Sequence, residues 1–179
     1  TINVRQSMQN KVRMIDALLA HLAGELPELR TVAGYEASAE RSAILAGKIA
    51  HAVDYLKGRK ARWEAILANF QSPAAAHQDL LDDTAKAAQR PNDRLIDLLL
   101  RRDLRISYRV EVVRALQDLF AGGELEPLLK SLESIHRRIR SSRLFIALHM
   151  HAGDGNVHTN IPVNSNDYEM LHEAERMVD

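Results

Sequence analysis

The sequence contains no cysteine, no long apolar run and no excess charge of either sign. Without cysteine, the chain cannot form disulfides, thiolate metal sites or a cysteine nucleophile, and it cannot ligate an iron–sulfur cluster. Its 24 basic and 24 acidic residues cancel, which gives no electrostatic reason to expect nucleic acid or an anionic membrane as a partner. No apolar run approaches the length of a membrane span, about 18 residues, and no signal-peptide pattern is visible. We therefore expect a cytoplasmic protein, at most peripheral to the inner membrane.

The composition is that of a folded domain. Of the 179 residues, 46% are hydrophobic and 27% are charged. The sequence starts at Thr1 rather than at a methionine, and it stops at Asp179 within a predicted helix. We expect it to be a fragment of a longer polypeptide.

Most of the sequence shows the periodicity of amphipathic helices. Apolar residues recur every three or four positions in residues 4–22, 44–70 and 124–140. A further apolar helix is expected near residue 95, with Asn92 as its N-terminal cap. The long pattern in 44–70 also supports an alternative function, in which the helical region is an interaction module that forms a homo-oligomer and has no catalytic activity of its own.

The segment after this apolar helix is ambiguous. Residues 105–112 alternate between polar and apolar side chains, which is typical of a strand. Tyr108 and Val112 also lie four positions apart, as on one face of a helix. We expect a helix over at least 112–120; if 105–112 is instead a strand, Tyr108 and Arg109 could reach a substrate.

The pattern changes beyond residue 142. Residues 143–150 and 156–163 form two short apolar segments around a Gly-Asp-Gly turn, which predicts a pair of strands. The sequence therefore predicts an α+β fold that is predominantly α-helical. Its expected parts are a helical region over 1–142 and, over 143–179, a small β-hairpin followed by a helix.

The turn between the two predicted strands carries a dense group of polar residues, "HMHAGDGNVHTN" (149–160). Side chains two apart in a strand share a face, so His149 and His151 are expected to point the same way. The turn would bring His158 across from His151, and neutral imidazoles are common ligands of zinc-type ions. Asn160 would share the face of His158 and could bind a substrate carboxylate. With His149 as a third ligand, the segment could instead form the three-histidine site of a metal hydrolase.

The same residue types also have a structural interpretation. Asp-Gly is a frequent hairpin turn, and a lone histidine on a strand is more often packed or exposed than a ligand. Gly153 and Gly155 permit positive φ angles and a close approach of a ligand to the backbone. Asp154 could either orient a histidine or bond to the backbone of the turn.

Residues His151–Asn160, "HAGDGNVHTN", resemble a family signature. The signature is His-x-Gly-Asp-Gly-Asn-x-His-x-Asn, in the C-terminal domain of FAD-linked oxidases of the vanillyl-alcohol oxidase type, and every fixed position is kept here. That group includes D-lactate, glycolate and D-2-hydroxyglutarate dehydrogenases. The flanking residues and, less specifically, the upstream helical region resemble the large members that carry FAD and iron–sulfur domains on one polypeptide.

The resemblance implies a role for each matched position. His151 and His158 are expected to be catalytic and to bind a divalent metal ion, with zinc as a candidate. The other matched positions would line the substrate and the cofactor, with Asn156 and Asn160 at the substrate and Gly153, Asp154 and Gly155 at the cofactor.

The implied reaction is oxidation of a D-2-hydroxy acid, with hydride transfer to FAD. The metal ion would polarise the substrate hydroxyl and carboxylate. FAD would be bound mainly by another domain of the parent chain, and any iron–sulfur clusters would also lie elsewhere in it. The family's third metal ligand is a glutamate in a Glu-His-Gly segment, which does not occur before Asp179. We therefore expect the chain by itself to be inactive.

Overall fold

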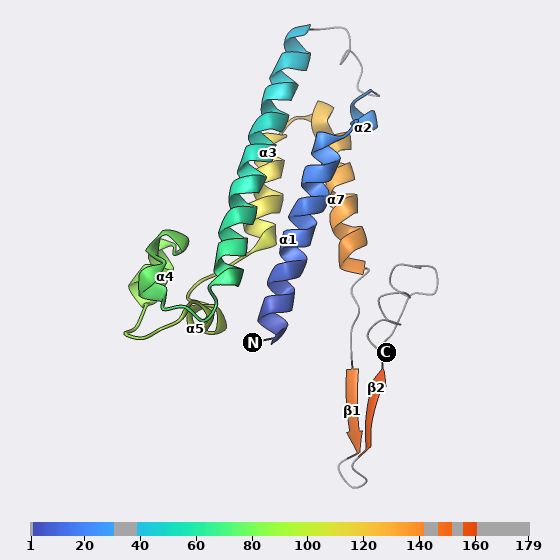
Figure 1. Ribbon diagram of the computed structural model, residues 1–179. Coiled ribbons are helices and arrows are strands. Elements are labelled where there is room, and N and C mark those ends of the chain that lie inside the picture. The colour runs from blue at the N-terminus through green and yellow to red at the C-terminus, as the bar shows by residue number, and fades with distance from the viewer. Residues whose placement is uncertain (1, 31–38, 142–146, 152–155, 161–179) are drawn as a thin grey trace. The chain divides into compact units, whose positions relative to one another are not determined.

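The computed structural model describes residues 2–30, 39–141, 147–151 and 156–160 (Figure 1). Predominantly helical elements follow one another along the chain, with two short strands near the C-terminus. In chain order they are α1 (Ile2–Ala23), α2 (Pro27–Arg30), α3 (Ala39–Ala68), the 3₁₀ turns η1 (Ala74–Ala76) and η2 (Gln78–Leu80), α4 (Asp83–Ala88), α5 (Leu95–Arg101), the π-helix η3 (Arg109–Arg114), α6 (Ala115–Leu119), the 3₁₀ turn η4 (Gly123–Leu125), α7 (Glu126–Ser141), β1 (Ala147–His151) and β2 (Asn156–Asn160).

The chain divides into two compact units, residues 1–133 and 134–179. The boundary between the units falls inside α7, whereas the sequence pattern predicted a boundary after residue 142. None of the helices among the described residues is both long enough and apolar enough to cross a membrane.

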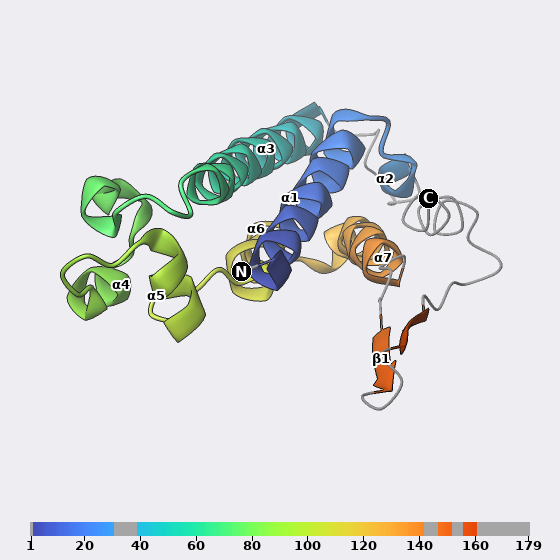
Figure 2. The same ribbon diagram turned by 60° about the horizontal axis from the view of Figure 1, so that its bottom comes forward.

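The core of the first unit is built on the pairing of α1 with α3. The two helices lie side by side in both views (Figures 1 and 2). α6 and η2 also contact α3. The buried face of α3 follows helical spacing, and it consists of Leu45, Ala52, Leu56, Trp63 and Ile66. The predicted helices over 4–22 and 44–70 are therefore confirmed. The apolar pattern of α3 is not fully buried, since Ile44 is 57% exposed.

The ambiguous segment forms no strand and is helical from Tyr108 on. Tyr108 already has helical backbone angles, and η3 and α6 continue without a break to Leu119. The strand interpretation of 105–112 is therefore wrong, and the helix expected over 112–120 is confirmed. The packed face decides the outcome, since Tyr108, Val112 and Leu116 are all buried and lie four residues apart.

The cap of the helix near residue 95 lies two residues later than expected. Asn92 has a φ of 68°, a left-handed conformation, whereas an N-cap residue is normally extended. Arg94 takes the cap position, and its backbone N–H donates to Asp97 at 3.0 Å. Backbone bonds from Ile96 N to the Phe70 carbonyl at 2.9 Å, and others beside it, tie this start to the end of α3.

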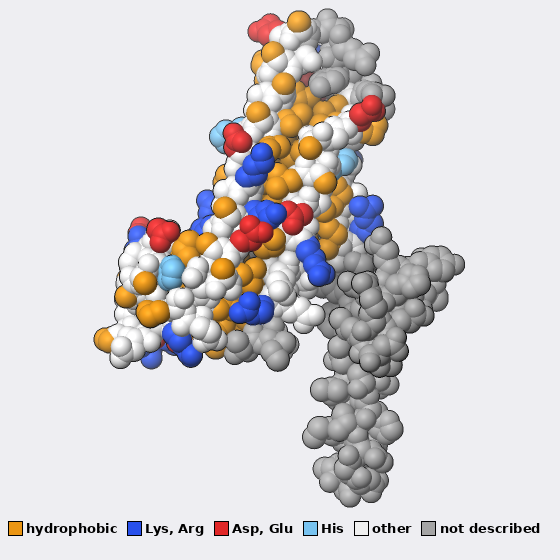
Figure 3. Space-filling view, viewed as in Figure 1, with side chains coloured by type: hydrophobic (Ala, Val, Ile, Leu, Met, Phe, Trp, Pro, Cys, Tyr) orange, Lys and Arg blue, Asp and Glu red, His pale blue; other side chains and the backbone are white. Residues whose placement is uncertain are grey.

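Surface charges of the first unit are mixed rather than segregated. Figure 3 shows acidic and basic side chains interspersed over the face formed by α1 and α3. Lys60 on α3 donates to Asp16 on α1 at 2.6 Å, and this bond raises the pKa of the lysine. The mixture agrees with the zero net charge of the sequence.

An ion pair between Asp93 and Arg101 closes the loop before α5. The guanidinium donates to both carboxylate oxygens, at 2.6 and 2.9 Å, and the Arg90 backbone N–H donates at 2.8 Å. The Arg101 hydrogen bonds, aided by the Arg90 backbone, lower the pKa of Asp93 from 3.8 to about 2. The Asp93 side chain is only 10% exposed, so this fixed geometry is sheltered from water.

We predict that the Asp93 ion pair makes stability depend on pH below about 4. Because the folded pKa lies below the unfolded value, the stabilisation is complete above the unfolded pKa of 3.8 and is lost as the pH falls through about 2. Thermal unfolding should show a lower Tm for Asp93→Asn at neutral pH and a shallower loss of Tm in acid. Asp54→Asn, at an exposed position on α3, is the control. An unchanged acid slope in Asp93→Asn would contradict the prediction.

Candidate functional site

The histidine segment lies on two antiparallel strands of the second unit. β1 and β2 pair so that His149 is opposite His158, His151 is opposite Asn156, and Ala147 is opposite Asn160. Opposed residues share a face, and so do residues two apart on one strand. Five polar positions therefore fall on one face of the pair, namely His149, His151, Asn156, His158 and Asn160. Leu148, Met150, Val157 and Thr159 occupy the other face.

This register corrects one expectation. His158 lies across from His149, not across from His151, which is its diagonal neighbour. The ladder continues to the His151–Asn156 pair. Directly opposed Cβ atoms are about 4.5–5.5 Å apart and diagonal positions about 7–8 Å apart. The three histidine positions are thus neighbours on one face of the strand pair.

The remaining predicted positions of the segment are not placed. Gly153, Asp154 and Gly155 lie outside the described residues, as does the helix expected from Asn166. Where side chains are described, essentially in the helical region, no group of three or more histidine, aspartate or glutamate residues could hold a metal ion.

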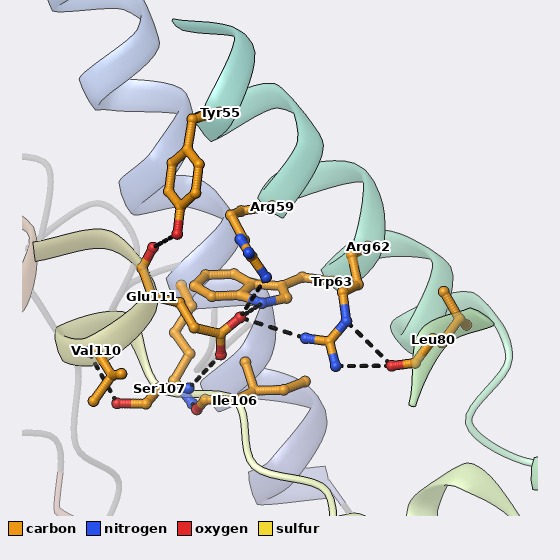
Figure 4. Close-up of polar contacts among 10 residues, drawn as sticks. Tyr55, Arg59, Arg62, Trp63, Leu80, Ile106, Ser107, Val110 and Glu111 are labelled. Atoms are coloured by element: carbon orange, nitrogen blue, oxygen red, sulfur yellow. Dashed lines mark hydrogen bonds and ion pairs between the residues drawn. The ribbon is translucent and has the colours of Figure 1, made fainter. Parts of the chain in front are cut away.

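A second polar cluster, which the sequence did not reveal, lies in the first unit around Glu111 of η3 (Figure 4). The carboxylate is 16% exposed. Its Oε1 accepts from the Ser107 backbone N–H at 2.9 Å, and its Oε2 accepts from the Trp63 indole N–H at 3.3 Å. The Tyr55 hydroxyl donates to the Glu111 carbonyl at 2.7 Å. One residue of the π-helix therefore receives donors from two turns of α3.

Two guanidinium groups of α3 also approach Oε2 of Glu111. Arg59 lies at 3.5 Å and Arg62 at 3.4 Å, which is longer than a strong charge-assisted hydrogen bond of about 2.7–2.9 Å. Arg62 makes its shorter bonds to the Leu80 carbonyl, at 2.8 and 3.1 Å. The cluster therefore joins α3 to both η2 and η3.

Tyr108 and Arg109, which could have reached a substrate from a strand, lie instead at the start of a helical segment. Tyr108 is 6% exposed and lies in the core of the first unit, where burial raises the pKa of its hydroxyl well above the usual range. Arg109 is exposed at the start of η3. The structure does not bring these two side chains together at a site.

Comparison of the chain with models of protein families, with curated proteins and with solved structures found no match.

We predict that Glu111→Ala destabilises the first unit by about 2–3 kcal/mol, because it leaves a buried indole N–H, a backbone N–H and the Arg59 guanidinium without their acceptor. Urea unfolding followed by the fluorescence of the single tryptophan measures the loss. Glu64→Ala is the matched control, since Glu64 is half-exposed and pairs only with Lys60 at 3.5 Å, and its effect should stay within about 0.5 kcal/mol. Equal losses of unfolding free energy in the two variants would show that the Glu111 carboxylate does not stabilise the packing of η3 on α3.

Proposed function

We propose that this chain belongs to a flavin-dependent oxidoreductase that oxidises a D-2-hydroxy acid of the D-lactate or glycolate kind. In this proposal β1 and β2 carry its metal- and substrate-binding residues. The observation that carries the proposal is that the signature residues His151, Asn156, His158 and Asn160 all occupy one face of the strand pair. A ten-residue signature would have little chemical meaning if its donors alternated between faces.

The donor set on this face fits a divalent cation. Neutral imidazole is a common ligand of zinc-type ions, and His151 and His158 are diagonal neighbours in the register. The amides of Asn156 and Asn160 can donate to a carboxylate, which would orient a 2-hydroxy acid over the cation. The ion supplies Lewis acidity that lowers the pKa of the substrate hydroxyl, and FAD supplies the hydride acceptor.

His149 has a separate role in this proposal. It lies directly opposite His158 and on the same face as His151, but outside the ten-residue signature. An imidazole that does not ligate the ion can accept the hydroxyl proton of the substrate near neutral pH. We therefore assign proton acceptance to His149 and cation binding to His151 and His158.

FAD would be bound by another part of the polypeptide. The described residues form helices and one strand pair, and no nucleotide-binding domain is among them. The proposal includes a cytoplasmic location, for which the absence of cysteine is the supporting observation.

The first test uses the full-length polypeptide, purified without oxygen. We expect a flavin absorbance spectrum that is bleached by one of D-lactate, glycolate and D-2-hydroxyglutarate. His151→Ala and His158→Ala should slow bleaching more than about 100-fold, because even outer-shell partners of metal ligands change activity about 10–100-fold. His51→Ala, at an exposed position on α3, is the control and should bleach normally. A polypeptide that binds no flavin would exclude the proposal.

The second test separates the roles of the three histidines. His149→Gln should retain the bound cation, measured by elemental analysis, while bleaching slows and loses its dependence on a group that titrates near neutral pH. The cross-strand pairing of His149 with His158 also fits the alternative three-histidine metal site of a hydrolase. Loss of the cation in His149→Gln, in a polypeptide without flavin, would favour that alternative.

A further inference from the structure

A pocket of about 510 Å³ opens beside the Glu111 cluster, within the first unit. Three stretches of chain form it, and they come from the end of α3, the start of α4 and the segment that leads into η3. Its lining consists of Arg59, Arg62, Leu81, Asp82, Arg105, Ser107, Val110 and Glu111. The volume falls within the range of small-molecule sites, about 300–1,000 Å³.

Positive charge exceeds negative charge in this pocket, with three arginines against two carboxylates. In both carboxylates, one oxygen already accepts a hydrogen bond from a backbone N–H. Asp82 Oδ1 accepts from Ala85 N at 2.8 Å as the cap of α4, and Glu111 Oε1 accepts from Ser107 N at 2.9 Å. Each of the two carboxylates therefore has only one oxygen left to accept hydrogen bonds from the guanidiniums.

The guanidinium groups of Arg59 and Arg105 have N–H donors that are not used by strong hydrogen bonds. Oε2 of Glu111 is shared by Trp63, Arg59 and Arg62, all at 3.3 Å or more, although a carboxylate oxygen has only about two acceptor positions. Among the described residues, Arg59 makes no other hydrogen bond, and Arg105 donates only through Nε, to the Arg102 carbonyl at 3.2 Å. The Cζ atom of Arg59 also lies 5.1 Å from the centroid of the Tyr55 ring, a cation–π contact.

We propose that this pocket binds a small oxyanion, such as a carboxylate or phosphate group, between Arg59 and Arg105. Planar guanidinium forks bind such groups through paired hydrogen bonds, which a single shared carboxylate oxygen does not satisfy. Arg62 is held by the Leu80 carbonyl and contributes charge behind the anion rather than a paired contact. The proposal is independent of the function assigned to β1 and β2, because it uses residues of the first unit alone.

The test is a titration of the full chain with sodium phosphate and with sodium malonate, each against sodium chloride at equal ionic strength. Trp63 is the only tryptophan and donates to Glu111, so its fluorescence reports on the edge of the pocket. We expect saturable binding of one of the two anions, weakened about tenfold by Arg59→Gln and by Arg105→Gln, since a hydrogen bond between charged groups is lost in each. The anion that saturates identifies the oxyanion class.

Two further variants sharpen the titration. Arg41→Gln is the matched control, because Arg41 is an exposed arginine of the same helix that lines a different pocket, and it should bind like the unaltered protein. Glu111→Gln should bind the anion more tightly, since one negative charge is removed from the pocket. The proposal is overturned if neither anion saturates, or if Arg105→Gln binds as tightly as Arg41→Gln.

Discussion

The carboxylate of Glu111 is the interaction on which the arrangement of the helical unit depends. It accepts hydrogen bonds from the Trp63 indole and from the Ser107 backbone, and it lies beside the guanidiniums of Arg59 and Arg62. A nearly buried charge is tolerated only where such donors surround it. Because Arg59, Arg62 and Trp63 belong to α3 and Glu111 to η3, the contact joins these two elements, and an arginine-rich pocket lies at its edge.

The helices were readable from the sequence because their apolar spacing matches the face that they bury. α1, α3 and α7 were all predicted within a few residues of their limits, since each buries one continuous face. The sequence pattern could not distinguish a strand from a helix over residues 105–112, because polar–apolar alternation and a four-residue apolar spacing coincide there. Contacts with α3 settle that segment, and those contacts are not visible in a local window.

The two candidate sites differ in how far they could be predicted from the sequence. For β1 and β2, strand alternation alone puts the His149 position with His151 and the His158 position with Asn160. The partner across from His158 was mispredicted, because it depends on where the ladder ends rather than on residue type. Glu111 was missed altogether, since its partners Arg59, Arg62 and Trp63 are 52, 49 and 48 residues away in the sequence.

The π-helical form of η3 gives the helical unit one place inside a helix where the loss of a residue can be absorbed. A π-helix hydrogen-bonds over five residues where an α-helix uses four, so it holds one more residue in the same rise. Removing a residue from η3 would return the segment to α-helical geometry over the same rise, so the turns on its two sides could keep their faces toward α3. The same loss inside α3 would turn its two ends by about 100° relative to each other. For this protein, a one-residue deletion in η3 is therefore a milder class of change than one inside α3.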